Sequence, residues 1–85
     1  MAKFKLRTKP VVVDATQITN DTFDAPHPNP DHIVRVVYDP MQRCAFIDTR
    51  EGRTRADLGD WIIRGVTGEL SVCKQDVFEA TYEPA

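Results

Sequence analysis

The sequence predicts a mainly β fold, either a small antiparallel barrel or a rolled sheet, with at most a short helical turn. Turn signals recur about every 8–12 residues, and the short runs between them alternate apolar and polar residues. The most strongly patterned stretch, residues 58–82, reads as a hairpin followed by a further alternating run. The sequence has no internal repeat and no linker, so residues 1–85 are expected to form a single domain.

The N-terminal part is predicted to form one long, bent strand. Residues 3–7 alternate basic and apolar side chains, with Phe4 and Leu6 facing inward. Pro10 interrupts the ladder because proline has no backbone N–H to donate. The alternation resumes over residues 11–16. We therefore expect the two pieces to continue one another near a sheet edge.

The middle of the chain is predicted to hold a connector and three strands. Residues 25–31 carry prolines in alternate positions, which disfavours a helix and predicts an extended connector or rigid loop. Residues 33–38 and 43–48 are expected to pair as strands across a turn at 39–42, where proline suits the second position. Residues 53–56 are expected to begin a short polar strand.

The C-terminal stretch is predicted to contain three strands, with turns at 58–60, 65–68 and 74–76. Residues 58–60 form a Gly-Asp turn signal, and the β-prone run 61–64 follows. Two glycines within 65–68 close that run, and alternation resumes over 69–73, which completes a hairpin. Apolar and polar residues alternate again over 78–82, which predicts a last strand.

Each end of the chain carries a recognisable sequence motif. Near the start, a basic segment leads into KPVVVDA at residues 9–15, and near the end GDWIIRGVTGE at 59–69 precedes CKQDVFEATYEP at 73–84. Together these motifs resemble a widespread family of small phage and prophage proteins, and the match covers about residues 3–18 and 46–84. The resemblance implies an origin in a virus that infects bacteria, and hence a place in the cytoplasm of the host bacterium. It implies no particular activity.

The chain departs from the family pattern at three residues and in one segment. Leu58 and Gln75 stand where the family usually has proline, and Ile18 replaces a usual tryptophan. The proline-rich segment 25–31 stands where the family commonly has an amphipathic helix after its first strand.

Composition limits the partners that we expect. A net charge of −2 argues against general nucleic-acid binding, and no apolar run is long enough to span a membrane. No apolar segment follows the basic start, so no secretory signal is expected. A chain this short buries only about 60–65% of its extended surface, and a partner subunit would help it. Its basic start and acidic tail could join copies into a ring, so a homo-oligomer is expected.

No cofactor, metal or catalytic residue is expected. His27 and His32 have a spacing that zinc sites use, but the sequence has no close cysteine pair to complete such a site. Cys44 and Cys73 are expected to be buried thiols, and a bridge between them stays open. Lys74 could lower the pKa of the Cys73 thiol, but one adjacent charge is weak evidence for a nucleophile. We therefore do not expect an enzyme.

The candidate ligand site is a group of arginines near Trp61. Arg53 and Arg55 share one face of their strand, Arg50 precedes them, and Arg64 lies three residues after Trp61, on the opposite face by parity. Guanidinium groups bind phosphate oxygens in pairs, and an indole stacks on a base, so the group would suit an anionic nucleotide. The alternative is a solvated arginine-rich strand beside a core tryptophan, paired with nearby carboxylates.

Three classes of function follow. The favoured class is a phage-encoded, non-enzymatic binding protein for counter-defence, which sequesters a host signalling nucleotide or inhibits a host defence protein. The alternative is a virion or morphogenesis accessory protein. A small nucleotide-cleaving enzyme comes third, because the sequence offers no recognisable catalytic set.

Overall fold

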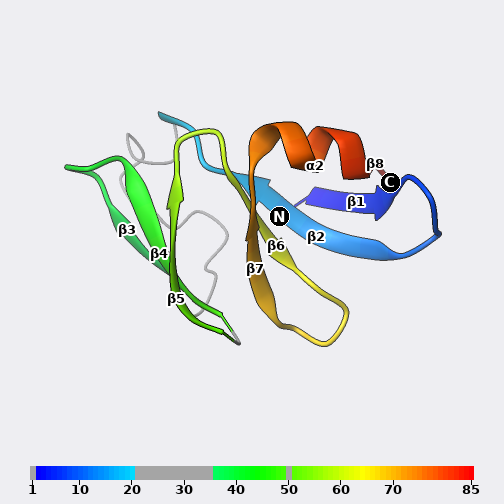
Figure 1. Ribbon diagram of the computed structural model, residues 1–85, viewed down its shortest axis with the longest axis horizontal. Coiled ribbons are helices and arrows are strands. Elements are labelled where there is room, and N and C mark those ends of the chain that lie inside the picture. The colour runs from blue at the N-terminus through cyan, green and yellow to red at the C-terminus, as the bar shows by residue number, and fades with distance from the viewer. Residues whose placement is uncertain (1, 21–35, 50) are drawn as a thin grey trace.

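The computed structural model describes residues 2–20, 36–49 and 51–85 (Figure 1). The predicted connector at 25–31, both histidines, residues 33–35 and Arg50 lie outside these ranges. The elements are β1 (Ala2–Leu6), β2 (Val12–Gln17), β3 (Val36–Asp39), β4 (Cys44–Thr49), β5 (Gly52–Asp57), β6 (Trp61–Arg64), β7 (Leu70–Cys73), α2 (Gln75–Thr81) and β8 (Tyr82–Pro84).

Two antiparallel sheets make up the fold. A five-stranded sheet has the order β7-β6-β2-β1-β8, and a three-stranded sheet has the order β3-β4-β5. The mainly β class is confirmed. Of the two expected architectures, the rolled sheet fits, because the two sheets do not close into one barrel. In Figure 1 the three-stranded sheet lies to one side and α2 runs along the five-stranded sheet.

The prediction of one long N-terminal strand is wrong, because β1 and β2 form a hairpin. Phe4 lies opposite Val13, and the Leu6 N–H donates to the Val11 carbonyl at 3.1 Å. Pro10 lies in the connection, where its missing N–H costs no ladder bond and its fixed backbone angle favours a turn. The interruption in the alternation therefore marks a reversal of the chain.

The predicted strand over residues 78–82 is also wrong for most of its length. Helix α2 covers Gln75–Thr81, and only β8 beyond it is extended. Phe78 and Tyr82 are four residues apart, so the same two apolar positions fit a helical face and an alternating strand. The residues between them, Glu79, Ala80 and Thr81, do not separate the two patterns. No helix within residues 2–20, 36–49 and 51–85 is long and apolar enough to cross a membrane.

The basic start and the acidic tail meet within one chain. Strand β8 pairs antiparallel with β1, and this register places Lys5 opposite Glu83. These charges can therefore pair within one chain. They do not need a ring in which the basic start of one copy meets the acidic tail of the next. Oligomer formation stays a prediction.

The five-stranded sheet is covered on both faces, so the core has two parts. Ile62 faces the three-stranded sheet, and its neighbour Ile63 faces α2, because successive strand residues point in opposite directions. The buried residues between the sheets are Ile18, Ala45, Ile47, Ala56, Ile62 and Leu70. Those beneath the helix are Val13, Ala15, Ile63 and Phe78.

Candidate functional site

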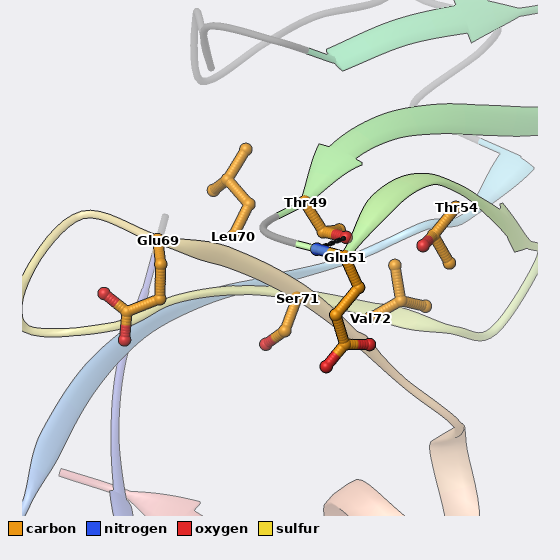
Figure 2. Close-up of a pocket in the computed structure, with 7 residues that line it drawn as sticks. All are labelled: Thr49, Glu51, Thr54, Glu69, Leu70, Ser71 and Val72. Carbon is orange, nitrogen blue, oxygen red and sulfur yellow. Dashed lines mark hydrogen bonds between the residues drawn. The ribbon is translucent and has the colours of Figure 1, made fainter.

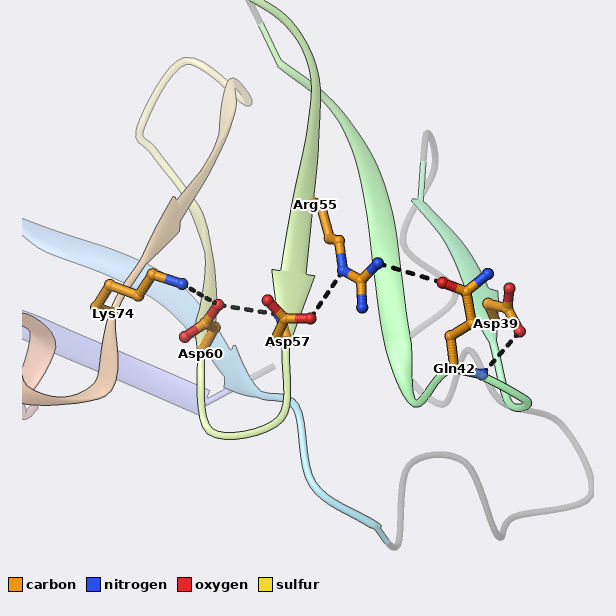
Figure 3. A network of polar contacts seen from close by, with 6 residues as sticks. All are labelled: Asp39, Gln42, Arg55, Asp57, Asp60 and Lys74. Atoms are coloured by element: carbon orange, nitrogen blue, oxygen red, sulfur yellow. Dashed lines mark hydrogen bonds and ion pairs between the residues drawn. The ribbon is translucent and has the colours of Figure 1, made fainter.

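A chain of polar contacts joins the two sheets at the Gly-Asp turn (Figure 3). The buried Asp60 carboxylate accepts the Asp57 N–H at 2.9 Å and the Lys74 ammonium at 3.1 Å. Gly59 has a positive φ of 90°, and its N–H donates to the Ile18 carbonyl at 2.8 Å. The hydrogen bond that Lys74 donates to Asp60 raises the pKa of Lys74 above its ordinary value. These contacts hold the end of β5 against the start of β6.

The arginines of β5 are bound to neighbouring acceptors. The Arg55 guanidinium donates to the Asp57 carboxylate at 2.8 Å and to the Gln42 side-chain carbonyl at 3.2 Å (Figure 3). Its hydrogen bond with Asp57 raises the pKa of Arg55. Arg53 pairs with Asp48 on the opposite strand at 3.4 Å. The predicted sharing of one strand face by Arg53 and Arg55 agrees with this register.

The structure does not bring Trp61 to the β5 arginines. The Trp61 ring stacks on Phe78 with centroids 4.0 Å apart and planes 7° apart, and the edge of Phe4 packs nearby. One face of the indole is therefore covered by the aromatic core beneath α2. The Trp61 Nε1 atom is buried and has no hydrogen-bond partner among the described residues. The aromatic residue directly across from Arg55 is Phe46.

Arg64 lies apart from the β5 arginines, in a cluster of ion pairs on the five-stranded sheet. The Asp14 carboxylate lies 2.6 Å from Lys3 and 3.0 Å from Arg64. These two cations lower the pKa of Asp14, with the bond from Lys3 the larger cause. The three side chains line a hollow of about 420 Å³ beside the β6–β7 turn. Nucleotide binding by the arginines stays a prediction, since each arginine in the described part of the group already holds a carboxylate.

Neither cysteine has the environment of a nucleophile. Cys44 is fully buried, and Cys73 is half-buried, and both thiols are free. Burial raises the pKa of the Cys73 thiol, and Asp76 and Asp60 raise it further. The Lys74 ammonium, which could have lowered that pKa, is instead held by Asp60. The adjacency of Lys74, which the sequence offers only as weak evidence for a nucleophile, therefore gains no support from the structure.

A groove of about 310 Å³ lies between the β4–β5 hairpin and strand β7 (Figure 2). Its volume is at the lower end of the range for ligand pockets. Three hydroxyls, two carboxylates and two apolar side chains line it. The described lining residues are Thr49, Glu51, Thr54, Glu69, Leu70, Ser71 and Val72.

The groove follows the edge of the five-stranded sheet. Strand β7 is the last strand of that sheet, and among the described strands it pairs only with β6. Successive side chains of a strand point to opposite faces, and in Figure 2 Leu70 extends away from Glu69 and Ser71. A groove that touches four consecutive residues, 69–72, must therefore run along the strand's backbone edge.

The hydrogen-bond pattern shows which backbone groups face this edge. Opposite residues in an antiparallel ladder alternate between bonded and non-bonded pairs. The Gly65 N–H donates to the Glu69 carbonyl at 2.9 Å, so this pair is bonded, and the next bonded residue on β7 is Ser71. The N–H and C=O groups of Leu70 and Val72 consequently point away from β6, toward the groove.

The neighbouring ladder gives the same assignment independently. The Ile18 N–H donates to the Asp60 carbonyl at 2.9 Å, in register with the pairing of β2 and β6. Ile62 and Arg64 therefore bond to β2, which leaves Trp61 and Ile63 to bond to β7. Trp61 lies opposite Cys73 and Ile63 opposite Ser71, so Leu70 and Val72 again face outward.

Sequence reasoning missed Glu51, Ser71 and the β7 edge. In the sequence, Glu51 is one of the carboxylates near the arginines and offers them a partner, and Ser71 reads as an ordinary polar strand position. The one available signal was the alternation over residues 69–73, which gives the faces of the strand but not its position in the sheet. No protein-family model, curated protein or solved structure matches the chain.

Proposed function

We propose that this chain is a non-catalytic binding protein that recognises its target at the groove along β7. The groove itself is the observation that carries the proposal. It combines two apolar side chains with carboxylates, hydroxyls and outward-facing backbone groups, and polar groups of these kinds orient a bound partner and give specificity. The resemblance to small phage proteins supports a setting in an infected bacterium, where such a protein would act in counter-defence.

A host protein is a better target for this groove than a signalling nucleotide. Glu51 and Glu69 line the groove, and carboxylates repel phosphate groups. Arg53 and Arg55, whose forked donors suit phosphate, are bonded to Asp48 and Asp57 instead. A nucleotide would have to displace these carboxylates before it could bind.

Site-specific photo-crosslinking tests this proposal. The photoreactive residue p-benzoylphenylalanine would replace Ser71, which is exposed in the groove, and in a second variant Val77, which is 52% exposed on α2. The variants would be irradiated in bacteria that produce them. We expect a discrete adduct from position 71 that is absent from position 77 and that persists when Arg53 and Arg55 are both changed to alanine. No adduct at position 71, or the same adducts at both positions, would overturn the proposal.

A further inference from the structure

We infer that the groove binds an extended peptide segment carrying a lysine or arginine, which pairs with β7 as an added strand. This inference rests on the proposed function and specifies the chemistry of the target. An added strand obtains its affinity from main-chain hydrogen bonds and its specificity from side-chain positions that alternate.

The backbone of β7 supplies the pairing groups. Leu70 and Val72 are outward-facing residues of the ladder, and each presents one N–H and one C=O. Exposed edges of this kind are ready templates for another strand. The groove along residues 69–72 gives a chain access to them.

The charge of the groove selects a basic segment. Glu51 and Glu69 are the charged residues among its described lining, and both are acidic. Because residues of an added strand alternate faces, the peptide residue opposite Ser71 shares the face of Ser71 and Glu69. Its neighbours then lie on the side of Leu70 and Val72. The preferred segment therefore reads apolar–basic–apolar.

A second copy of this chain is a poor occupant. Two strands in the described part carry two cations each: β1 with Lys3 and Lys5, and β5 with Arg53 and Arg55. Both edges of β1 are already occupied, one by β2 and the other by β8. On β5, Arg53 and Arg55 hold Asp48 and Asp57, and neither arginine is flanked by apolar residues on both sides. We therefore expect the segment to come from another protein.

Nuclear magnetic resonance titration of the isotopically labelled full chain tests this inference. The probe is a capped peptide, Thr-Thr-Val-Lys-Val-Thr-Thr, with matched versions that carry glutamate or norleucine in place of lysine. We expect the largest amide shifts at Leu70 and Val72, and binding of the lysine peptide at least about tenfold tighter than the glutamate peptide, or about 1.4 kcal/mol. N-methylation of the peptide amides that pair with β7 should abolish binding.

Two variants separate charge from shape. Changing Glu51 and Glu69 together to glutamine should bring the lysine and norleucine peptides to similar affinity, whereas Glu79→Gln, on the exposed face of α2, should leave their difference unchanged. Shifts centred away from β7, equal affinity for the lysine and glutamate peptides, or binding that tolerates N-methylation would overturn the inference. If the position 71 adduct persists while the peptides fail, the binding function stands and the peptide chemistry is wrong. If the adduct also fails, both are wrong.

Discussion

Two edge strands of this molecule differ in whether their polar groups already have bonding partners. On β5, at the edge of the three-stranded sheet, Arg53 and Arg55 are each bonded to a carboxylate. On β7, at the edge of the five-stranded sheet, Leu70 and Val72 direct backbone groups into a groove. The density of arginine in the sequence points to the first edge, and the hydrogen-bond pattern points to the second. Whether a polar group already has a partner therefore says more about a site than how many charges lie nearby.

The pairing of the β5 arginines follows from strand geometry. Arg55 and Asp57 are two residues apart, so they lie on the same face of one strand. Arg53 lies directly opposite Asp48 on β4, where opposite charges attract. Each arginine thus meets a carboxylate as soon as the hairpin forms.

The largest effect that we predict tests the position of Trp61. If its indole were a stacking surface for a nucleotide beside the β5 arginines, it would not be packed in the core. Phe78→Ala should lower the free energy of unfolding by about 3–5 kcal/mol, because it opens a cavity against the stacked indole. Urea denaturation would measure the loss. The control Val77→Ala, on the exposed side of the same helix, should change stability by less than about 0.5 kcal/mol. A loss at Phe78 no larger than the control would place the indole outside the core.

The second effect concerns the polar contacts of Asp60 that join the two sheets. Asp60→Ala should cost about 2 kcal/mol, since it leaves the Asp57 N–H and the Lys74 ammonium without their buried acceptor. Asp48→Ala removes an exposed ion pair and should cost at most about 1 kcal/mol. Denaturation of both variants under one condition gives the comparison. Equal losses of stability would mean that the contacts of Asp60 stabilise the fold no more than an exposed ion pair does.

A smaller effect is expected for the arginines themselves. Changing Arg53 and Arg55 together to alanine should cost at most about 1 kcal/mol for each residue, because both pairs are exposed. Thermal melting against a panel of cyclic dinucleotides should give no ligand-induced rise in the melting temperature of the parent chain. A rise in the parent that the double variant loses would make the β5 face the binding site and would reverse our comparison.

The smallest effect is a dependence of stability on pH. Lys3 and Arg64 lower the pKa of Asp14 from its ordinary value of 3.8, so the folded chain holds this carboxylate charged at a lower pH than the unfolded chain does. The stabilisation is fully present above pH 3.8 and is lost as the pH falls through the folded value. The stability difference between the parent and Asp14→Asn should therefore shrink from pH 6 toward pH 2 in denaturation curves. A difference that is constant over this range would show that Asp14 is not held by these cations.

Local pattern predicted the β3–β4 and β6–β7 hairpins, but neither the β1–β2 hairpin nor the sheet topology. The turn between β6 and β7 can be predicted because it needs a residue with positive φ, and Gly68 supplies one at 88°. Helix α2 could not be distinguished from a strand, since Phe78 and Tyr82 suit both periods. The edge position of β7 depends on β2 pairing with β6, which joins Asp14 to Arg64 across fifty positions. No short pattern encodes that contact, so the groove was not predictable.

Hydrogen exchange of the backbone amides, followed residue by residue, tests the central claim most directly. If β7 is an open edge that uses alternate residues to bind β6, the amides of Ser71 and Cys73 should be protected and those of Leu70 and Val72 should exchange much faster. Addition of the lysine peptide should then protect Leu70 and Val72. Equal protection along all four residues of the unbound chain would show that the edge is already occupied, and would contradict the account.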